Sequence, residues 1–315
     1  MNINHRSGEG GVRLQVEELV VNWHLTEACN YGCQYCYSTW AKQECSAELH
    51  RDPQAIVQVL EELYRFFRPQ NPSNPLSAAL DWKHLRLSIA GGEPTLLKDR
   101  LDFVINTARN IGFRVSLITN ASLLDHARVQ MIAPQLSCLG ISLDSAHLMT
   151  NQLIGRSDRF GGGKAVNGTQ DLIRTARAAN PSISIKINTV VNAINADEDM
   201  TPVIKLLEPN KWKVLRVLPV HSPALAVTDE QFRRFVLRHQ KMLSVMAVED
   251  NADMLQSYLM IDPLGRFFQN AQGQTGYTYS RPIHQVGAEA AFAETGFSIG
   301  KFARRYTSEQ LAEVG

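Results

Sequence analysis

Three of the five cysteines lie within eight consecutive positions, spaced as ligands of a shared metal centre are spaced. They are Cys29, Cys33 and Cys36, in the segment CNYGCQYC. Thiolates in one irregular loop can surround a single metal or cluster. Structural zinc ordinarily takes four ligands, and Cys45 is available as a fourth, so a zinc-stabilised binding protein without catalysis is one alternative. Three thiolates on a [4Fe–4S] cluster would instead leave one iron open to a non-protein ligand.

A second group of candidate residues is basic. Arg86, Lys186, Lys211 and Lys213 stand in runs where apolar and polar residues alternate. Alternate side chains of a strand point to opposite faces, so these four cations share a face if their strands form one sheet. An unpaired buried charge is costly. A group of cations on an enclosed face therefore predicts an anionic ligand.

The elements that would position both groups are strand-like runs separated by helical segments. The runs cover 19–26, 84–92, 113–120, 136–145, 182–191 and 211–220. The clearest helical segments cover 52–67, 100–112 and 167–180. Strands that alternate with helices predict an α/β fold with a parallel sheet. Right-handed crossovers would curl six such units into a partial (βα)6 barrel.

The polar face of these runs indicates the inside of that barrel. Asn22 and His24 lie on it in the first run and Ser142 in the fourth, whereas the opposite face carries residues such as Trp23 and Ile185. Parallel strands covered on both faces by a core would be almost uniformly apolar. An antiparallel sheet with one wet face is the alternative, and it explains the alternation but not the intervening helices.

Composition and charge narrow the class of protein. The chain has 315 residues, 44% hydrophobic and 20% charged, with a net charge of +1, so no global field recruits nucleic acid or an acidic membrane. No apolar run is long enough to span a bilayer, and the start of the chain lacks the apolar core of a signal peptide. Five cysteines in this spacing do not indicate a disulfide framework. We expect a cytoplasmic protein with neither nucleic acid nor membrane as partner.

Three regions are expected along the chain. Residues 1–18 form a flexible leader, 19–220 the barrel, and 221–315 a C-terminal α+β extension that closes the substrate site. The extension is indicated because the alternation of strand-like runs with helical segments stops after the sixth run. It opens with Thr-Asp-Glu-Gln at 228–231, a capping-box sequence that predicts a helix, and continues with a short apolar run at 257–268.

The cysteine segment resembles the signature of the radical S-adenosylmethionine (SAM) enzymes. The sequence Gly-Gly-Glu-Pro at 91–94 is similar to the motif with which that family grips the methionine amino group of SAM. The positions that match cofactor contacts in the family are Gly91, Gly92, Glu93, Thr119, Asn120, Ser142 and Arg156. The resemblance implies a [4Fe–4S] cluster on Cys29, Cys33 and Cys36, and SAM on its open iron. Electron transfer to SAM would then give a 5′-deoxyadenosyl radical that abstracts a hydrogen atom.

A longer series of motifs resembles the viperins, one group of radical SAM enzymes. The series runs from about residue 19 to the C-terminus and includes NWHLTEACNYGCQYCY, LSIAGGEP, IKINTVVNAINADEDM, NKWKVLRVLPV and SYLMIDPLGRF. Viperins dehydrate CTP to 3′-deoxy-3′,4′-didehydro-CTP, a chain terminator for viral polymerases, and prokaryotic relatives use UTP or GTP. The resemblance implies a nucleoside triphosphate lyase in antiviral (anti-phage) defence, with a flavodoxin- or ferredoxin-type electron donor.

The same resemblance implies roles for single residues. Tyr258 matches a tyrosine proposed to assist proton delivery as the 3′-hydroxyl leaves. The matches to nucleotide-binding positions are Asn22, His24, Arg86, Lys186, Asn188, Lys211 and Lys213. Glu249 and Asn251 match the pattern without an assigned role. Three basic residues near the C-terminus are expected to close over the site: Lys301, Arg304 and Arg305.

Some features depart from the viperin pattern. The loop at 270–280 lacks the Lys and Arg of the animal enzymes, and Ala90 stands where they have serine, so the preferred base stays open. The amphipathic anchor helix of vertebrate viperins is not recognisable, which favours a prokaryotic-type enzyme. A radical SAM peptide-modifying enzyme is a further alternative. Such enzymes often carry additional C-terminal cysteines for auxiliary clusters, and no cysteine follows Cys138.

Overall fold

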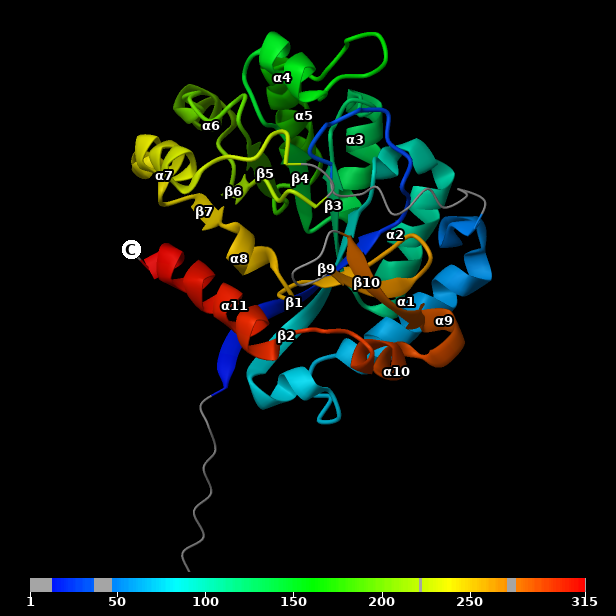
Figure 1. Cartoon of the computed structure of the whole chain (residues 1–315). Helices are drawn as coiled ribbons and strands as arrows, with labels where there is room; N and C mark the ends of the chain where they lie inside the picture. The colour runs from blue at the N-terminus through cyan, green and yellow to red at the C-terminus, as the bar shows by residue number, and fades with distance from the viewer. Residues whose placement is uncertain (1–12, 37–46, 221–222, 271–275, 315) are drawn as a thin grey trace, which may run out of the picture.

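The computed structural model describes residues 13–36, 47–220, 223–270 and 276–314. Its centre is a ten-stranded sheet in the order β10-β9-β8-β1-β2-β3-β4-β5-β6-β7 (Figure 1). The strands are β1 (Leu14–His24), β2 (Leu80–Ala90), β3 (Arg114–Thr119), β4 (Cys138–Ser142), β5 (Ser184–Val191), β6 (Lys211–Arg216), β7 (Met246–Glu249), β8 (Leu259–Ile261), β9 (Arg266–Asn270) and β10 (Tyr277–Pro282).

The six predicted runs form six neighbouring parallel strands, β1 to β6. The α/β prediction is therefore confirmed, and the antiparallel alternative is wrong. One boundary differs from the expectation. Strand β1 begins at Leu14, where it pairs with Leu80, so it reaches into the segment expected to be a leader.

Strands of the C-terminal extension add to both ends of the parallel array. Strand β7 adds in parallel to β6 at one end of the array, and β8 adds in parallel to β1 at the other. Strands β9 and β10 continue from β8 in antiparallel order. The sequence pattern missed this because β7 and β8 are short, and their pairing partners lie far away in the chain.

Helices follow one another around the outside of the strands, from α1 to α7 (Figure 1). The α-helices are α1 (Pro53–Phe67), α2 (Asp99–Ile111), α3 (His126–Ile132), α4 (Leu148–Ile154), α5 (Val166–Ala179), α6 (Thr201–Leu207), α7 (Asp229–Arg238), α8 (Asn251–Met254), α9 (Ile283–Val286), α10 (Ala288–Ala293) and α11 (Ile299–Val314). Short 3₁₀ helices are η2 (Leu49–Arg51), η3 (Pro75–Ala78), η4 (Pro94–Leu97), η5 (Ala133–Gln135) and η6 (Gln240–Met242). No helix in the described ranges has the length and apolar character needed to cross a bilayer.

Local sequence explains where the predicted helices begin and end. The Asp52 side chain accepts two backbone N–H bonds at the start of α1, and Pro53 occupies its first turn. Helix α2 ends at Gly112, whose φ of 120° suits glycine. The predicted capping box of Thr228 and Gln231 is formed at the start of α7.

The two faces of the parallel strands differ as predicted. Trp23, Ile185, Ile187 and Trp212 are fully buried in one continuous core between strands and helices. Burying such side chains contributes about 1.5–3 kcal/mol each. This apolar face holds the helices to the sheet and leaves the polar face to the inside of the curved array.

Register aligns the polar residues across strands. Lys186 of β5 pairs with Gly140 of β4 on one side and Lys211 of β6 on the other, and Asn188 pairs with Lys213. Paired residues of neighbouring parallel strands point to the same face. A Cβ atom on Gly140 would stand 3.2 Å from Lys186 Cε, so this glycine leaves room for the lysine.

Candidate active site

The cysteine loop follows the carboxyl end of β1 and is anchored to the residues that end α4. The Gly32 N–H donates to the Gly155 carbonyl at 3.1 Å, and the Gln34 N–H donates to the Ile154 carbonyl at 3.0 Å. A Cβ atom on Gly155 would stand 2.3 Å from the Gly32 oxygen, and its φ is +84°. The contact therefore requires glycine at 155.

Cys29, Cys33 and Cys36 are free thiols in this loop. Burial raises the pKa of Cys33 to about 12, opposed by nearby Arg156 and reinforced by the neighbouring thiols. Burial also raises the pKa of Cys29. Ligation requires the thiolate form, so binding of a metal centre here must displace protons.

Two side-chain donors point toward these sulfurs. Asn120 Nδ2 lies 4.0 Å from the Cys29 sulfur, and an Arg156 guanidinium nitrogen lies 4.0 Å from the Cys33 sulfur. Donors at thiolate sulfur stabilise its negative charge, as they do around iron–sulfur clusters. Three soft thiolates with such support fit a cluster of this kind.

Within the described ranges no three His, Cys, Asp or Glu side chains, the three cysteines of this loop included, are arranged to hold one metal ion. This finding bears equally on zinc and on a cluster, so metal content has to separate the two. Cys45, the predicted fourth zinc ligand, lies outside the described residues.

The Gly-Gly-Glu segment closes β2 against the start of the cysteine loop. The Gly92 N–H donates to the Thr26 carbonyl at 2.7 Å, and the Glu93 N–H donates to the Ala28 carbonyl at 2.8 Å. A Cβ atom on Gly92 would stand 2.2 Å from the Ala28 oxygen. The close approach that these glycines permit is thus to the chain's own backbone.

The Glu93 carboxylate is fully buried and links the ends of β2 and β3. It accepts hydrogen bonds from Thr95, from the Thr119 hydroxyl at 2.7 Å and from the Asn120 N–H at 2.7 Å. Three of the residues predicted to contact SAM are therefore brought together beside Cys29. In these contacts Glu93 is a positioning residue, and its contact with SAM stays a prediction.

Arg156 lies in a buried polar group at the end of β4. Its guanidinium donates to the Ser142 carbonyl at 2.8 Å and to the Tyr35 hydroxyl at 3.1 Å, and it lies 3.6 Å from the Asp144 carboxylate. Burial opposes the charge, but Asp144 and Tyr35 raise the pKa of Arg156 above its ordinary value. Sequence reasoning assigned no role to Asp144, although it lies two residues after Ser142 on the same face.

The predicted basic residues lie near one another. Burial, together with the charges of Lys213, Arg86 and Lys211, lowers the pKa of Lys186 to about 8. Like charges exert this effect only at short range, so all four cations surround one region. The Arg86 guanidinium also pairs with Glu18 of β1 at 2.9 Å, a partner that the sequence did not indicate.

Tyr258 joins the two ends of the parallel array. It lies just before β8, yet its hydroxyl accepts from Lys213 Nζ of β6 and donates to the Glu249 carboxylate at the end of β7. Lys213 Nζ also lies 2.7 Å from Glu249. Burial opposes ionisation of Glu249, but Lys213 and Arg305 hold its pKa at about 2.

Helix α11 contributes a basic residue to this group. The Arg305 guanidinium lies over the Tyr258 ring, 3.5 Å from its centroid, and donates to the Ser257 carbonyl. Lys301 Nζ donates to the Leu255 carbonyl at 3.4 Å. Arg304 is exposed to solvent and does not share this arrangement.

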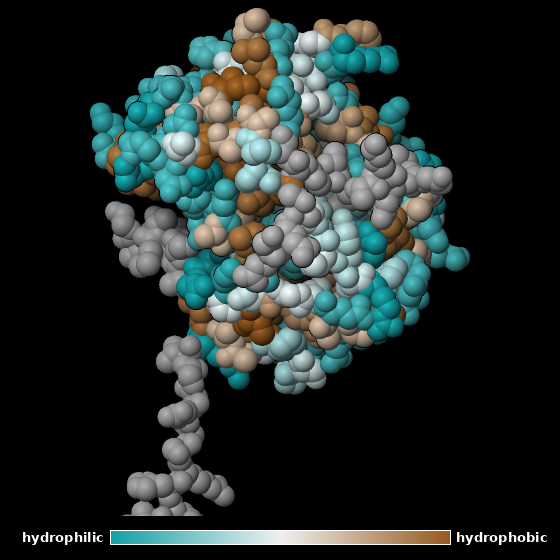
Figure 2. All heavy atoms as spheres, viewed as in Figure 1, coloured by the Kyte–Doolittle hydropathy of each residue, from teal (hydrophilic) through white to brown (hydrophobic). Residues whose placement is uncertain are grey.

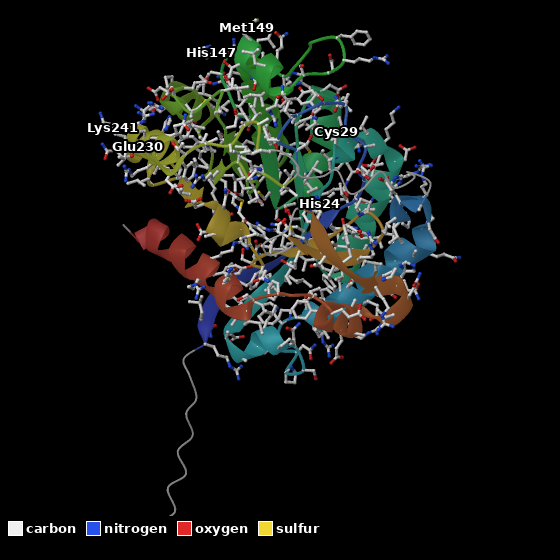
Figure 3. The ribbon with its side chains drawn as sticks, viewed as in Figure 1. His24, Cys29, His147, Met149, Glu230 and Lys241 are labelled. Atoms are coloured by element: carbon white, nitrogen blue, oxygen red, sulfur yellow. The ribbon has the colours of Figure 1, made fainter. Side chains whose placement is uncertain are left out.

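His24 and Asn22 lie on the polar face of β1, and Figure 3 places His24 at the centre of the molecule. Burial lowers the pKa of His24 to about 3, so the ring is neutral at physiological pH. It packs edge-on against Phe268 of β9, with ring centroids 5.4 Å apart. The Asn22 amide donates to the Leu259 carbonyl at 3.3 Å, which ties β1 to β8.

Comparison with known proteins identifies the family. The Radical SAM superfamily profile matches residues 23–207, more than half of the chain. The S-adenosylmethionine-dependent nucleotide dehydratase of Pseudoalteromonas ulvae is 43% identical over 296 residues, covering 94% of this chain and 95% of that protein. The protein named S-adenosylmethionine-dependent nucleotide dehydratase RSAD2 of Danio rerio is 29% identical over 300 residues, covering 90% of this chain and 76% of that protein.

Solved structures show the same fold at low identity. The structure of anSMEcpe with bound AdoMet and the Kp18Cys peptide matches with a TM-score of 0.65 at 15% identity, over 94% of this chain and 84% of that one. Streptococcus suis SuiB bound to S-adenosylmethionine matches with a TM-score of 0.61 at 12% identity, over 91% of this chain and 68% of that one. The predictions of a radical SAM enzyme and of its partial barrel are confirmed: the chain belongs to the radical SAM superfamily and, within it, to the family of S-adenosylmethionine-dependent nucleotide dehydratases.

Proposed function

We propose that this protein dehydrates a nucleoside triphosphate (CTP, UTP or GTP) to its 3′-deoxy-3′,4′-didehydro form, a chain terminator in anti-phage defence. The observation that carries the proposal is the gathering of Lys186, Lys211, Lys213 and Arg86 on the inner face of strands whose carboxyl ends carry the cysteine loop. Several cations in a water-poor pocket suit a triphosphate.

The cofactors of the proposed reaction are a [4Fe–4S] cluster and SAM. Cys29, Cys33 and Cys36 would hold the cluster, with Asn120 and Arg156 donating toward the sulfurs. When bound, cluster and SAM supply the 5′-deoxyadenosyl radical that removes a hydrogen atom from the ribose. The predicted SAM contacts Gly91, Gly92, Glu93, Thr119, Asn120, Ser142 and Arg156 stay part of this proposal.

The triphosphate is placed by the basic group. Lys186 is a cation at neutral pH because its pKa of about 8 lies above 7. Asn188, whose strand neighbour is Lys213, would extend this surface toward the nucleoside, as would Asn22 and His24 on the polar face of β1. Neutral His24 can hydrogen-bond a sugar or base without adding charge.

Tyr258 is the proposed catalytic residue. Its hydroxyl sits between Lys213 and Glu249 and is therefore held in one position. Departure of the ribose 3′-hydroxyl as water requires one proton, and a positioned tyrosine hydroxyl can deliver it. Delivery would redirect the Tyr258 proton from Glu249 to the leaving oxygen, and Lys213, which donates to the Tyr258 oxygen, would stabilise the tyrosinate left behind.

A nucleotide screen tests the proposal. Anaerobically reconstituted protein is incubated with SAM, a reductant and each of the four ribonucleoside triphosphates, and products are analysed by mass spectrometry. The expected product is lighter than its substrate by one water. Lys186→Met should lose it, while Lys241→Met, on the exposed surface, should not. Cleavage of SAM without any didehydro product from the four nucleotides would refute the proposal.

Metal content tests the cofactor separately. Cys36→Ala should lose iron and sulfide. Cys138→Ala, a change to the buried thiol of β4, should retain both. Bound zinc in place of iron would favour the non-catalytic alternative.

A further inference from the structure

Large apolar side chains are exposed on and just after helix α4. Leu148 is 54% exposed, Met149 68%, Leu153 59% and Phe160 82%, and we call these four residues the α4 patch. Figure 2 shows apolar atoms gathered at the end of the molecule where Figure 1 places α4, and Figure 3 places Met149 at that edge. Concentrated exposed apolar surface of this kind marks an interaction site.

The α4 patch is joined directly to the cysteine loop. Besides the backbone bonds of Gly32 and Gln34 described above, the Gln34 side chain donates to the Leu153 carbonyl at 2.9 Å. Beyond the patch, the Lys164 N–H donates to the Tyr31 hydroxyl at 3.2 Å. The end of α4 and the end of the loop that follows it are thus both bonded to the loop of Cys29, Cys33 and Cys36.

The exposed loop after α4 is ordered by its own hydrogen bonds. The Asp158 carboxylate accepts the N–H groups of Phe160 at 2.8 Å and Gly162 at 2.9 Å. The Gln152 side chain donates to the Gly161 carbonyl at 2.9 Å. A hydrogen-bonded turn therefore holds Phe160 in its solvent-exposed position.

The charge around the α4 patch is positive. Segment 147–164 contains Arg159 and Lys164 besides Arg156, which is buried beside Asp144, and its single acidic residue is Asp158. The Asp158 carboxylate is turned into the loop, whereas Arg159 is exposed and lies over the Phe160 ring at 4.7 Å. An apolar surface with a cationic rim suits an acidic partner.

We propose that the α4 patch is the docking surface for an acidic flavodoxin, which delivers the electron to the cluster. This inference rests on the proposed function, because it assumes a cluster on the three cysteines. A flavodoxin presents the apolar edge of its flavin within an acidic rim, which complements both features of the patch. The flavin loses one electron and the cluster gains it; no bond forms or breaks and no proton is transferred in that step.

Binding measurements test the docking surface independently of turnover. Calorimetric titration of reconstituted protein with a purified bacterial flavodoxin should show binding that weakens as salt increases. Met149→Glu and Leu153→Glu should each weaken it about tenfold or more, because each places a negative charge in an apolar contact with an acidic partner. Arg159→Glu should remove most of the salt dependence. Leu237→Glu is the matched control, since Leu237 is 55% exposed on α7, and Figure 3 shows Glu230 of the same helix away from Cys29.

A chemical reductant separates docking from chemistry. With dithionite, SAM cleavage by Met149→Glu and Leu153→Glu should equal that of the unaltered protein, whereas flavodoxin-driven cleavage should fall with binding. If the unaltered protein did not cleave SAM with dithionite, the proposed function would be refuted. The calorimetric titration would still show whether flavodoxin binds at the α4 patch. Unchanged flavodoxin affinity in both glutamate variants would overturn the docking proposal. So would binding of ferredoxin alone, or self-association of the chain that these substitutions abolish in analytical ultracentrifugation.

Discussion

Lys213 and Glu249 form an ion pair of 2.7 Å, with side chains only 12% and 9% exposed. A lysine proposed to hold phosphate is thus already matched by a carboxylate, which also accepts from Tyr258. Lys213 of β6 and Glu249 of β7 both bond to Tyr258, the residue before β8. The ion pair therefore links a proposed phosphate-binding lysine to the contact between the two ends of the parallel array.

Glu249→Gln should destabilise the protein at pH 7. The pKa of Glu249 falls from 4.5 to about 2 on folding, which corresponds to about 3 kcal/mol of stabilisation. A lowered carboxylate pKa stabilises above pH 4.5, and this contribution is lost as pH falls from 4.5 toward 2. Urea unfolding should show the difference between variant and parent at pH 7 and a smaller one at pH 3.5. Glu230→Gln, at an exposed pair with Arg233, should change stability little; equal effects of both substitutions would contradict the assignment.

Tyr258→Phe should lower kcat by about 100-fold or more, because it removes the proposed proton donor. The nucleotide KM should change little, since the lysines remain. Product formation and SAM cleavage are measured together at saturating nucleotide. Tyr279→Phe, on β10, serves as the control. Unaltered kcat in Tyr258→Phe would exclude the catalytic role.

Lys186 should give triphosphate binding a specific pH dependence. Its pKa of about 8 makes it cationic below pH 8 and neutral above, so affinity should fall between pH 7 and 9. Bound phosphate favours the cation, hence binding near pH 8.5 should take up a proton. Calorimetry in buffers of different ionisation enthalpy measures this uptake, and Lys186→Met should abolish it. An uptake that persists in the variant would assign it to another group.

Two neighbouring glycines offer a matched test of the cysteine loop. Gly155→Ala should destabilise the loop by about 1–2 kcal/mol through its left-handed backbone alone, with a further cost because the new Cβ meets the Gly32 oxygen. Gly32→Ala places its Cβ in open space. Iron and sulfide content after reconstitution should therefore fall in Gly155→Ala and stay near the parent value in Gly32→Ala. Equal iron content in the two variants would show that the close contact does not support the cluster site.

The sequence by itself determined the strands, their faces and the positions of the cysteines. Period-two alternation is local, so β1 to β6 and the shared face of Lys186 and Lys213 follow from neighbouring residues. The cysteine spacing is also local and was enough to predict the cluster loop.

Only the tertiary structure decided how distant segments meet. Glu249 carries no local signal that distinguishes it from an exposed glutamate, and its pairing with Lys213 depends on β7 lying beside β6. Likewise, Arg86 pairs with Glu18, and Gly92 is required by the backbone at Ala28. The free energy of such contacts comes from burial and close approach between elements far apart in the chain, and periodicity along the sequence does not encode them.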